Sequence, residues 1–141
     1  MFEKDFVSRM TQWRSLRSDI DRSNNPIQDV LDFWNQAPTS RIASDPYDDE
    51  TWPNPWEMIK ENIYCDFTKI LAIYYTLQLT ERFSQSVFEI HIVLDKEESD
   101  LKYLLFVDNQ VIGYYNDRSV DIQELPTLQC QMRYDNLPSY H

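Results

Sequence analysis

Hydrophobic residues recur every three or four positions through residues 1–20, with charged residues between them. This spacing predicts an amphipathic helix. Its apolar stripe consists of Phe2, Phe6, Met10, Trp13, Leu16 and Ile20. A second helix is predicted to start at Pro26, where Asn25 can cap it and Gln28 can close a capping box.

A third and a fourth helix are predicted after a long acidic segment, residues 37–54, that shows no helical or strand period. Asn54, Pro55 and Glu57 form another helix start signal. The helix that follows Cys65 is apolar around most of its circumference, so it is predicted to lie in the core. Its apolar residues are Phe67, Ile70, Leu71, Ile73, Tyr74 and Leu77.

From residue 86 onward the period changes to two, which predicts strands. In "VFEIHIVLD", a row of apolar residues alternates with a row that contains His91. A simple hairpin after this strand would place Asp95 opposite Leu101 and His91 opposite Leu105. Helices followed by hairpin-linked strands indicate an α+β fold with an antiparallel sheet of four or five strands. We expect one domain with a helical arm (1–36), an acidic loop (37–54) and an α+β body (55–141).

The formal net charge of −11 excludes a typical nucleic-acid-binding protein and a protein that docks on anionic lipid. No apolar run is long enough to span a membrane, and the N-terminus does not resemble a signal peptide. Gly113 is the only glycine, which excludes glycine-rich phosphate loops and the nucleotide-dependent enzymes that use them. No cofactor is therefore expected, and the protein is expected to be made in a cytoplasm.

The chain has two cysteines and two histidines, and their spacing predicts no zinc site. The acidic cluster Asp45, Asp48, Asp49 and Glu50 lacks the spacing of a calcium loop, so no metal is expected. Cys65 lies at the start of the central helix, where the helix dipole favours a thiolate. The alternative interpretation is that Cys65 is a small apolar core residue and His91 a structural one.

A cysteine before a helix, then a strand with His91, then a strand that ends at Asp108 resembles the core order of the transglutaminase-like cysteine enzymes. The resemblance covers about Asn54 to Tyr115. It implies a transglutaminase-like topology in which the Cys65 thiolate attacks an acyl group, His91 shuttles protons and Asp108 orients the imidazole. Tyr64 stands before Cys65, where the family usually has a small residue.

A second resemblance centres on Trp52-Pro53-x-Pro55-Trp56. Together with "YTLQLTERF" and "FEIHI", this element is similar to a family of small uncharacterised proteins of contractile-tailed marine bacteriophages. The resemblance implies a protein carried in the virion, and it implies no catalytic residue.

The main hypothesis is a non-catalytic adaptor of the phage head–neck–tail assembly, with other virion proteins as partners in a symmetric arrangement. The expected interface residues are Phe2, Phe6, Trp13, Leu16, Ile20, Trp52 and Trp56, because aromatic residues anchor interfaces. The first helix is expected to pack at least partly on another chain. One alternative is a thiol-dependent hydrolase or transamidase that uses Cys65 and His91. Another is an acidic inhibitor that mimics nucleic acid.

Overall fold

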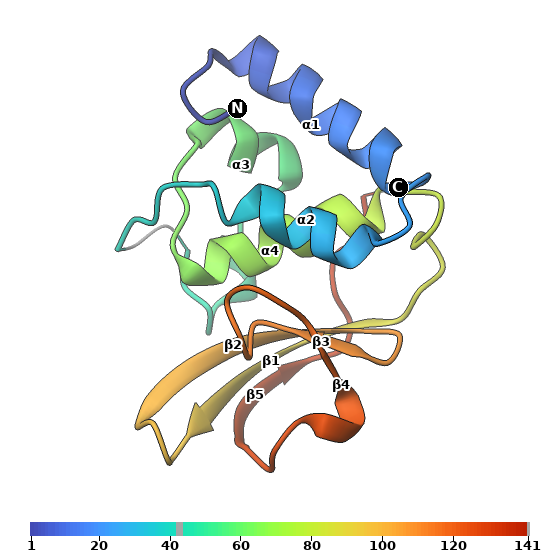
Figure 1. Cartoon of the computed structure of the whole chain (residues 1–141). Coiled ribbons are helices and arrows are strands. Elements are labelled where there is room, and N and C mark those ends of the chain that lie inside the picture. The colour runs from blue at the N-terminus through green and yellow to red at the C-terminus, as the bar shows by residue number, and fades with distance from the viewer. Residues whose placement is uncertain (42–43, 141) are drawn as a thin grey trace.

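Helices and strands separate into two layers (Figure 1). The computed structural model describes residues 1–41 and 44–140. The α-helices are α1 (Phe6–Ile20), α2 (Pro26–Trp34), α3 (Pro55–Glu61) and α4 (Asp66–Gln78). The strands are β1 (Phe88–Asp95), β2 (Asp100–Val107), β3 (Gln110–Ile112), β4 (Val120–Asp121) and β5 (Gln129–Tyr134). They form an antiparallel five-stranded sheet in the order β4-β3-β2-β1-β5, which confirms the α+β prediction.

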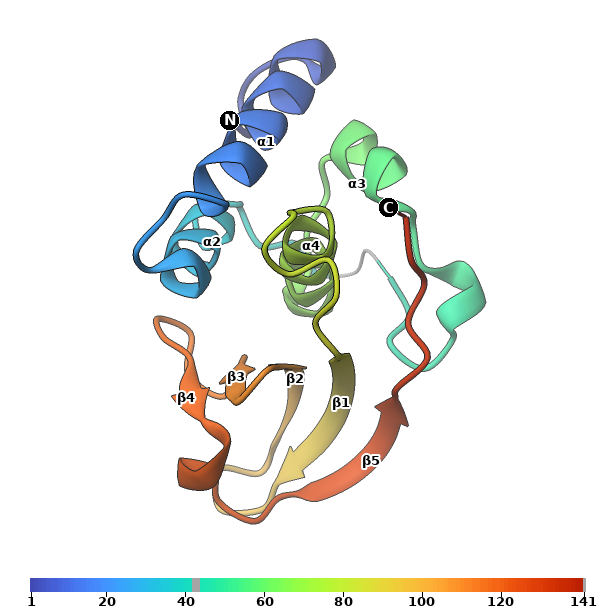
Figure 2. The ribbon, with the colours of Figure 1, turned by 90° about the vertical axis from the view of Figure 1, so that its right-hand side faces the viewer.

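Helix α4 is the centre of the core, as its all-round apolar sequence predicts. Cys65 precedes its first turn in an extended conformation, and nearly every residue from Phe67 to Gln78 is buried. One side of α4 lies on the sheet, and α1, α2 and α3 surround the other sides (Figure 2). A helix that is apolar all round needs cover on every side. The sheet alone cannot supply it.

Helix α1 is part of this core, so the predicted packing of residues 1–36 on another chain is wrong for its main apolar residues. The side chains of Trp13 and Ile20 are fully buried. The Trp13 indole N–H donates to Thr76 Oγ1 of α4 over 2.9 Å. The Arg9 guanidinium donates to the carbonyl oxygens of Ile59 and Lys60 at the end of α3, over 3.2 Å each. The arm and the body therefore share one hydrophobic core.

The remaining predicted interface residues divide into two groups. Leu16 is partly buried against the core, and Phe2 contacts the rings of other core aromatics. Trp52 is buried and packs on Phe67 of α4. The core of the same chain therefore buries Trp52, against the interface assignment, and partly buries Phe2 and Leu16. Phe6 and Trp56 are 39% and 44% exposed, and for them an interface stays a prediction.

The sheet has an inner face toward the helices and an outer face with a small cluster of its own. On β1, Ile90 and Phe88 belong to the main core, whereas Val93 belongs to the outer cluster. Asp95 pairs with Asp100 and His91 with Leu104, so the predicted register is wrong by one residue. The reason is a tighter turn that takes Asp100 into β2.

Of the two predicted capping boxes, the structure contains one. Asn54 and Glu57 form the predicted capping box. Asn25 makes no side-chain capping bond, and Gln28 donates to Asp32 and to the carbonyl oxygen of Asp117 instead. Within residues 1–41 and 44–140, no helix has the length and apolar character needed to cross a membrane.

Candidate functional site

Cys65 lies at the amino end of α4, at the inner face of the sheet. Its side chain is 7% exposed. Its Sγ lies 3.1 Å from Thr68 Oγ1, and the Thr68 hydroxyl donates to Ser44 Oγ over 3.2 Å. With that proton directed at Ser44, the Thr68 oxygen is available to accept a hydrogen bond from the thiol. The helix start thus places Cys65 where the transglutaminase-like order predicts a nucleophile, within a chain of hydroxyl contacts.

Tyr103 of β2 is the inner-face residue next to this helix start. Its ring packs edge-on against Phe67 with 5.3 Å between the centroids. Burial raises the pKa of the Tyr103 phenol above its usual 10.0, and the electrostatic influence of Tyr47, Cys65 and Asp66 adds to this increase. Tyr103 is therefore a protonated phenol at neutral pH. In that form it can donate a hydrogen bond but cannot act as a general base.

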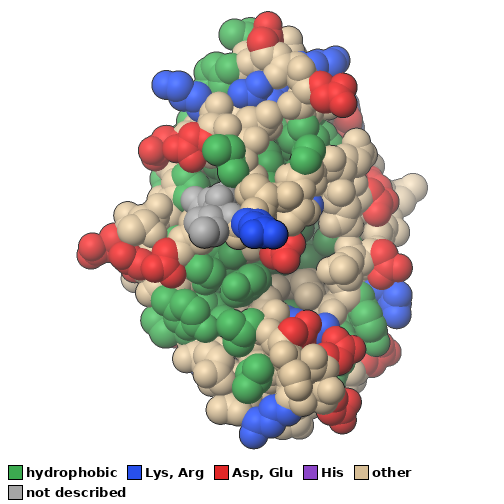
Figure 3. Space-filling view, turned by 90° about the vertical axis from the view of Figure 1, so that its left-hand side faces the viewer, with side chains coloured by type: hydrophobic (Ala, Val, Ile, Leu, Met, Phe, Trp, Pro, Cys, Tyr) green, Lys and Arg blue, Asp and Glu red, His purple; other side chains and the backbone are tan. Residues whose placement is uncertain are grey.

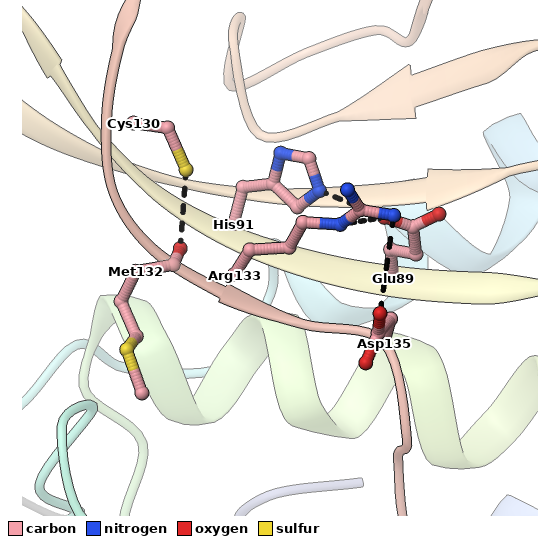
Figure 4. A network of polar contacts seen from close by, with 6 residues as sticks. All are labelled: Glu89, His91, Cys130, Met132, Arg133 and Asp135. Atoms are coloured by element: carbon pink, nitrogen blue, oxygen red, sulfur yellow. Dashed lines mark hydrogen bonds and ion pairs between the residues drawn. The ribbon is translucent and has the colours of Figure 1, made fainter.

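His91 lies on the outer face of the sheet, in the polar network shown in Figure 4. Its Nε2 lies 3.1 Å from Glu89 Oε1, which also accepts a hydrogen bond from Arg133 Nε over 2.7 Å. The imidazole ring packs on Phe106, with the centroids 4.2 Å apart. The hydrogen bond with His91, and then the contacts with Arg133, lower the pKa of the Glu89 carboxyl. This network joins β1 to β5.

The structure does not bring Cys65 and His91 together. Ile90 and Ile92, which flank His91 on β1, are fully buried, and Ile90 belongs to the core between sheet and helices. Successive residues of a strand point to opposite faces, so the sheet separates the imidazole from the thiol. The alternation in "VFEIHIVLD" already contained this signal. If the apolar residues of the strand pack on the central helix, the alternate residues, which include His91, must point away from it.

Asp108 lies at the opposite end of α4 from Cys65. It occupies the β2–β3 turn with a φ of 52°, and it lines a hollow with Arg82 and Gln85, which follow the end of α4. Helix α4 has 13 residues. At about 1.5 Å per residue this is a length of roughly 20 Å. The three residues of the predicted triad are therefore in three different places.

A cleft of about 710 Å³ opens between the helices α2 and α4 and the strands β2 and β3. Lys69 projects from α4, donates to Thr39 Oγ1 over 2.7 Å, and has a lowered pKa because it is partly buried. Lys102 pairs with Glu98 over 3.3 Å. Tyr103 also lines this cleft, which therefore runs from the Cys65 end of α4 to the β2–β3 edge. Its polar walls suit a polar ligand or a peptide segment.

One acidic group that the sequence interpretation missed lies in the β1–β2 turn. Oxygen atoms of Asp95, Glu98 and Asp100 all lie within 4.8 Å of one another, so these carboxylates could hold a cation. Asp95 Oδ1 already accepts from the backbone N–H groups of Glu97 and Glu98, over 3.1 and 3.4 Å. Glu98 also pairs with Lys102. These bonds explain the cluster as part of the turn, and the acidic run "DKEESD" was the signal for it.

The comparisons with known proteins bear on the fold. No protein-family model and no curated protein matches the chain. Among solved structures, the chain is similar to calcium-bound LapG of Legionella pneumophila, with a TM-score of 0.68 and 16% sequence identity. The match covers 94% of this chain and 77% of the LapG chain. Four helices followed by a five-stranded antiparallel sheet are thus the transglutaminase-like fold that the chain shares with LapG.

Proposed function

We propose that the chain is a non-catalytic binding protein, an adaptor built on a transglutaminase-like fold. The observation that carries the proposal is the position of His91. It lies on the outer face of the sheet, whereas Cys65 lies under the helices on the inner face. In the usual thiol mechanism, an imidazole must come within hydrogen-bond distance of the sulfur. His91 cannot do so, because its side chain points to the face of the sheet opposite Cys65.

The residue beside the Cys65 end of α4 supports the same proposal. Tyr103 has a raised pKa, so its phenol keeps its proton at neutral pH. General bases work best with a pKa near the working pH. Tyr103 therefore supplies no general base for the Cys65 thiol.

The likeness of Trp52-Pro53-x-Pro55-Trp56 to small phage proteins suggests where the adaptor acts. We infer a role among the proteins of a virion, in the head–neck–tail assembly. Trp56 is the exposed member of this element and packs edge-on against Tyr140, with 5.9 Å between the centroids. An exposed indole held by a neighbouring ring is a suitable interface anchor.

A thiol-dependent hydrolase is the second candidate, and the fold favours it. LapG is a transglutaminase-like cysteine protease, and Cys65 stands at the start of the central helix. Under this hypothesis Cys65 would be activated by its helix terminus, and its base would be a group other than His91.

Alkylation of the native protein by iodoacetamide separates the two candidates. The variant Cys130→Ser leaves only Cys65, and Cys65→Ser leaves only Cys130, so the two thiols can be followed separately. Cys130 is exposed and Cys65 is buried. The binding-protein proposal therefore expects Cys130 to react much faster than Cys65, with Cys65 reacting readily only after denaturation.

The enzyme hypothesis expects the reverse order. A Cys65 that reacts faster than the exposed Cys130, at a rate that stays high below pH 7, would mark an activated thiolate and overturn the proposal. The exposed Cys130 is the internal control, because its rate gives the reactivity of an accessible thiol under the same conditions.

A further inference from the structure

The inner face of the sheet extends beyond the start of α4, and no helix of the described residues 1–41 and 44–140 lies above this part. Tyr103 is paired with Ile92, which is paired on its other side with Met132 of β5. The next inner-face pair is Leu94 with Leu101. Residues directly opposite in an antiparallel pair share a face. Because α4 begins at Asp66, over Tyr103, these rows form an uncovered sheet end made of Leu94, Leu101, Tyr103 and Met132.

Apolar surface at this sheet end is open to solvent. Leu101 is 44% exposed and Met132 is 38% exposed. Tyr47 is 50% exposed and follows Pro46, whose carbonyl oxygen accepts a hydrogen bond from Tyr134 of β5, so the 44–50 segment lies beside the same area. Figure 3 shows hydrophobic side chains gathered on this face, with acidic side chains on both sides of them.

Carboxylates surround the uncovered sheet end. On the β5 side, Tyr134 donates to the carbonyl oxygen of Pro46 over 2.8 Å. Burial first, and then the carboxylates of Asp49, Asp45 and Asp48, raise the pKa of the Tyr134 phenol, which places this acidic segment beside β5. On the other sides stand Asp66 at the start of α4 and Glu98 and Asp100 at the start of β2.

The two lysines that line the cleft with Asp66, Glu98 and Asp100 already have partners. Lys102 is held by Glu98 over 3.3 Å and by the carbonyl oxygen of Tyr114 over 3.2 Å. Lys69 is on the cleft side and donates to Thr39. The carboxylates named at the border of the apolar area therefore outnumber these two lysines.

We propose that the uncovered sheet end docks a basic segment of a partner protein. Large apolar side chains of that segment lie on Leu101, Met132 and Tyr47, and its lysines or arginines pair with the acidic border. This inference rests on the proposed function as a binding protein and names the partner's chemistry. A second copy of the chain fits the surface poorly, because each copy carries a net charge of −11. Complementary charge steers association and rejects like-charged partners.

The test uses the full chain with ¹³C-labelled methionine methyl groups. The chain has four methionines. Met132 lies in the proposed surface, whereas Met10 and Met58 lie in the helical layer and serve as internal controls. The probes are synthetic peptides with the same leucine and tryptophan positions and either lysine or glutamate between them. A third peptide keeps the lysines and replaces the apolar residues with serine.

We expect the lysine–apolar peptide to shift the Met132 methyl signal in a saturable way and to leave Met10 and Met58 unchanged. The glutamate peptide and the lysine–serine peptide should bind at least about tenfold more weakly, a loss of about 1.4 kcal/mol. Leu101→Ser should weaken the lysine–apolar peptide by a similar factor. The matched control is Val87→Ser, which removes an apolar side chain that is 74% exposed outside the proposed surface, and should not change the affinity.

Three results would overturn the inference. The first is equal affinity for the lysine and glutamate peptides, which would mean that hydrophobic contact alone drives binding and that the acidic border does not select the partner's charge. The second is the absence of a Met132 shift with any peptide. The third is a Met132 shift that depends on protein concentration alone, which would make a second copy the occupant. The alkylation of Cys65 is measured without peptide, so failure of this inference is distinguishable from failure of the proposed function.

Discussion

Thr76 in the last turn of α4 accepts hydrogen bonds from two buried indoles, and replacing it with valine tests whether α1 belongs to the core. Trp13 Nε1 of α1 and Trp34 Nε1 of α2 lie 2.9 and 3.0 Å from Thr76 Oγ1. The hydroxyl itself donates to the carbonyl oxygen of Ala72 over 2.6 Å. One oxygen atom therefore connects three helices.

The magnitude follows from the two donors that lose their acceptor. Trp13, Trp34 and Thr76 are each fully buried, so water does not replace the lost bonds. An unsatisfied buried donor costs about 1–3 kcal/mol, and two of them cost about 2–6 kcal/mol. Valine has nearly the same shape as threonine, so the change creates no large cavity. We expect Thr76→Val to lower the free energy of unfolding by an amount in this range.

Urea unfolding followed by far-UV circular dichroism measures this loss. With a slope of about 2 kcal/mol per molar urea, the midpoint should fall by roughly 1–3 M while the slope stays constant. The matched control is Thr11→Val. The Thr11 hydroxyl makes the same bond to the carbonyl four residues earlier, at 3.0 Å, but it is exposed and receives no indole. Its free energy of unfolding should change by less than about 0.5 kcal/mol.

A double-mutant cycle gives the refuting result. Trp13→Phe should cost less in the Thr76→Val background than in the natural protein, because one unsatisfied donor is removed with the indole. If Thr76→Val is as mild as Thr11→Val, the two indoles do not depend on this hydroxyl. The proposed connection between α1 and the core would then be refuted.

Three further predictions concern the same fold. Gly113→Ala should lower the melting temperature strongly, because the added Cβ would lie 2.1 Å from the carbonyl oxygen of Tyr103 at a φ of +109°; an unchanged melting curve would contradict this. Deletion of residues 1–22 should abolish the cooperative melt seen by circular dichroism, since it exposes the apolar cover of α4; a retained melt would show an independent body. The lowered pKa of Glu89, caused first by its hydrogen bond with His91, gives stability that is present above the unfolded pKa near 4.5 and is lost as pH falls through the lower folded value. Glu89→Gln should remove this acid-side dependence in urea unfolding at several pH values, and an unchanged dependence would refute it.

The sequence by itself determined the elements and the fold class. The change of hydrophobic period from 3.6 to 2 after residue 86 located the helices and the sheet. Asn54 and Glu57 specified a capping box that the structure contains. These features are local, because a helix face, a cap and a strand alternation each depend on residues a few positions apart.

Only the tertiary structure decided what covers α4 and what lies near Cys65. From the sequence alone, the apolar stripe of α1 could pack on a neighbouring chain or on its own chain. The hydrogen bond from Trp13 to Thr76 shows that it packs on its own chain. The separation of Cys65 from His91 depends on which face of β1 meets the helices. The uncovered sheet end depends on where α4 begins relative to Tyr103. These arrangements join residues far apart in the chain, and packing of the whole core selects among alternatives that the local pattern leaves equal.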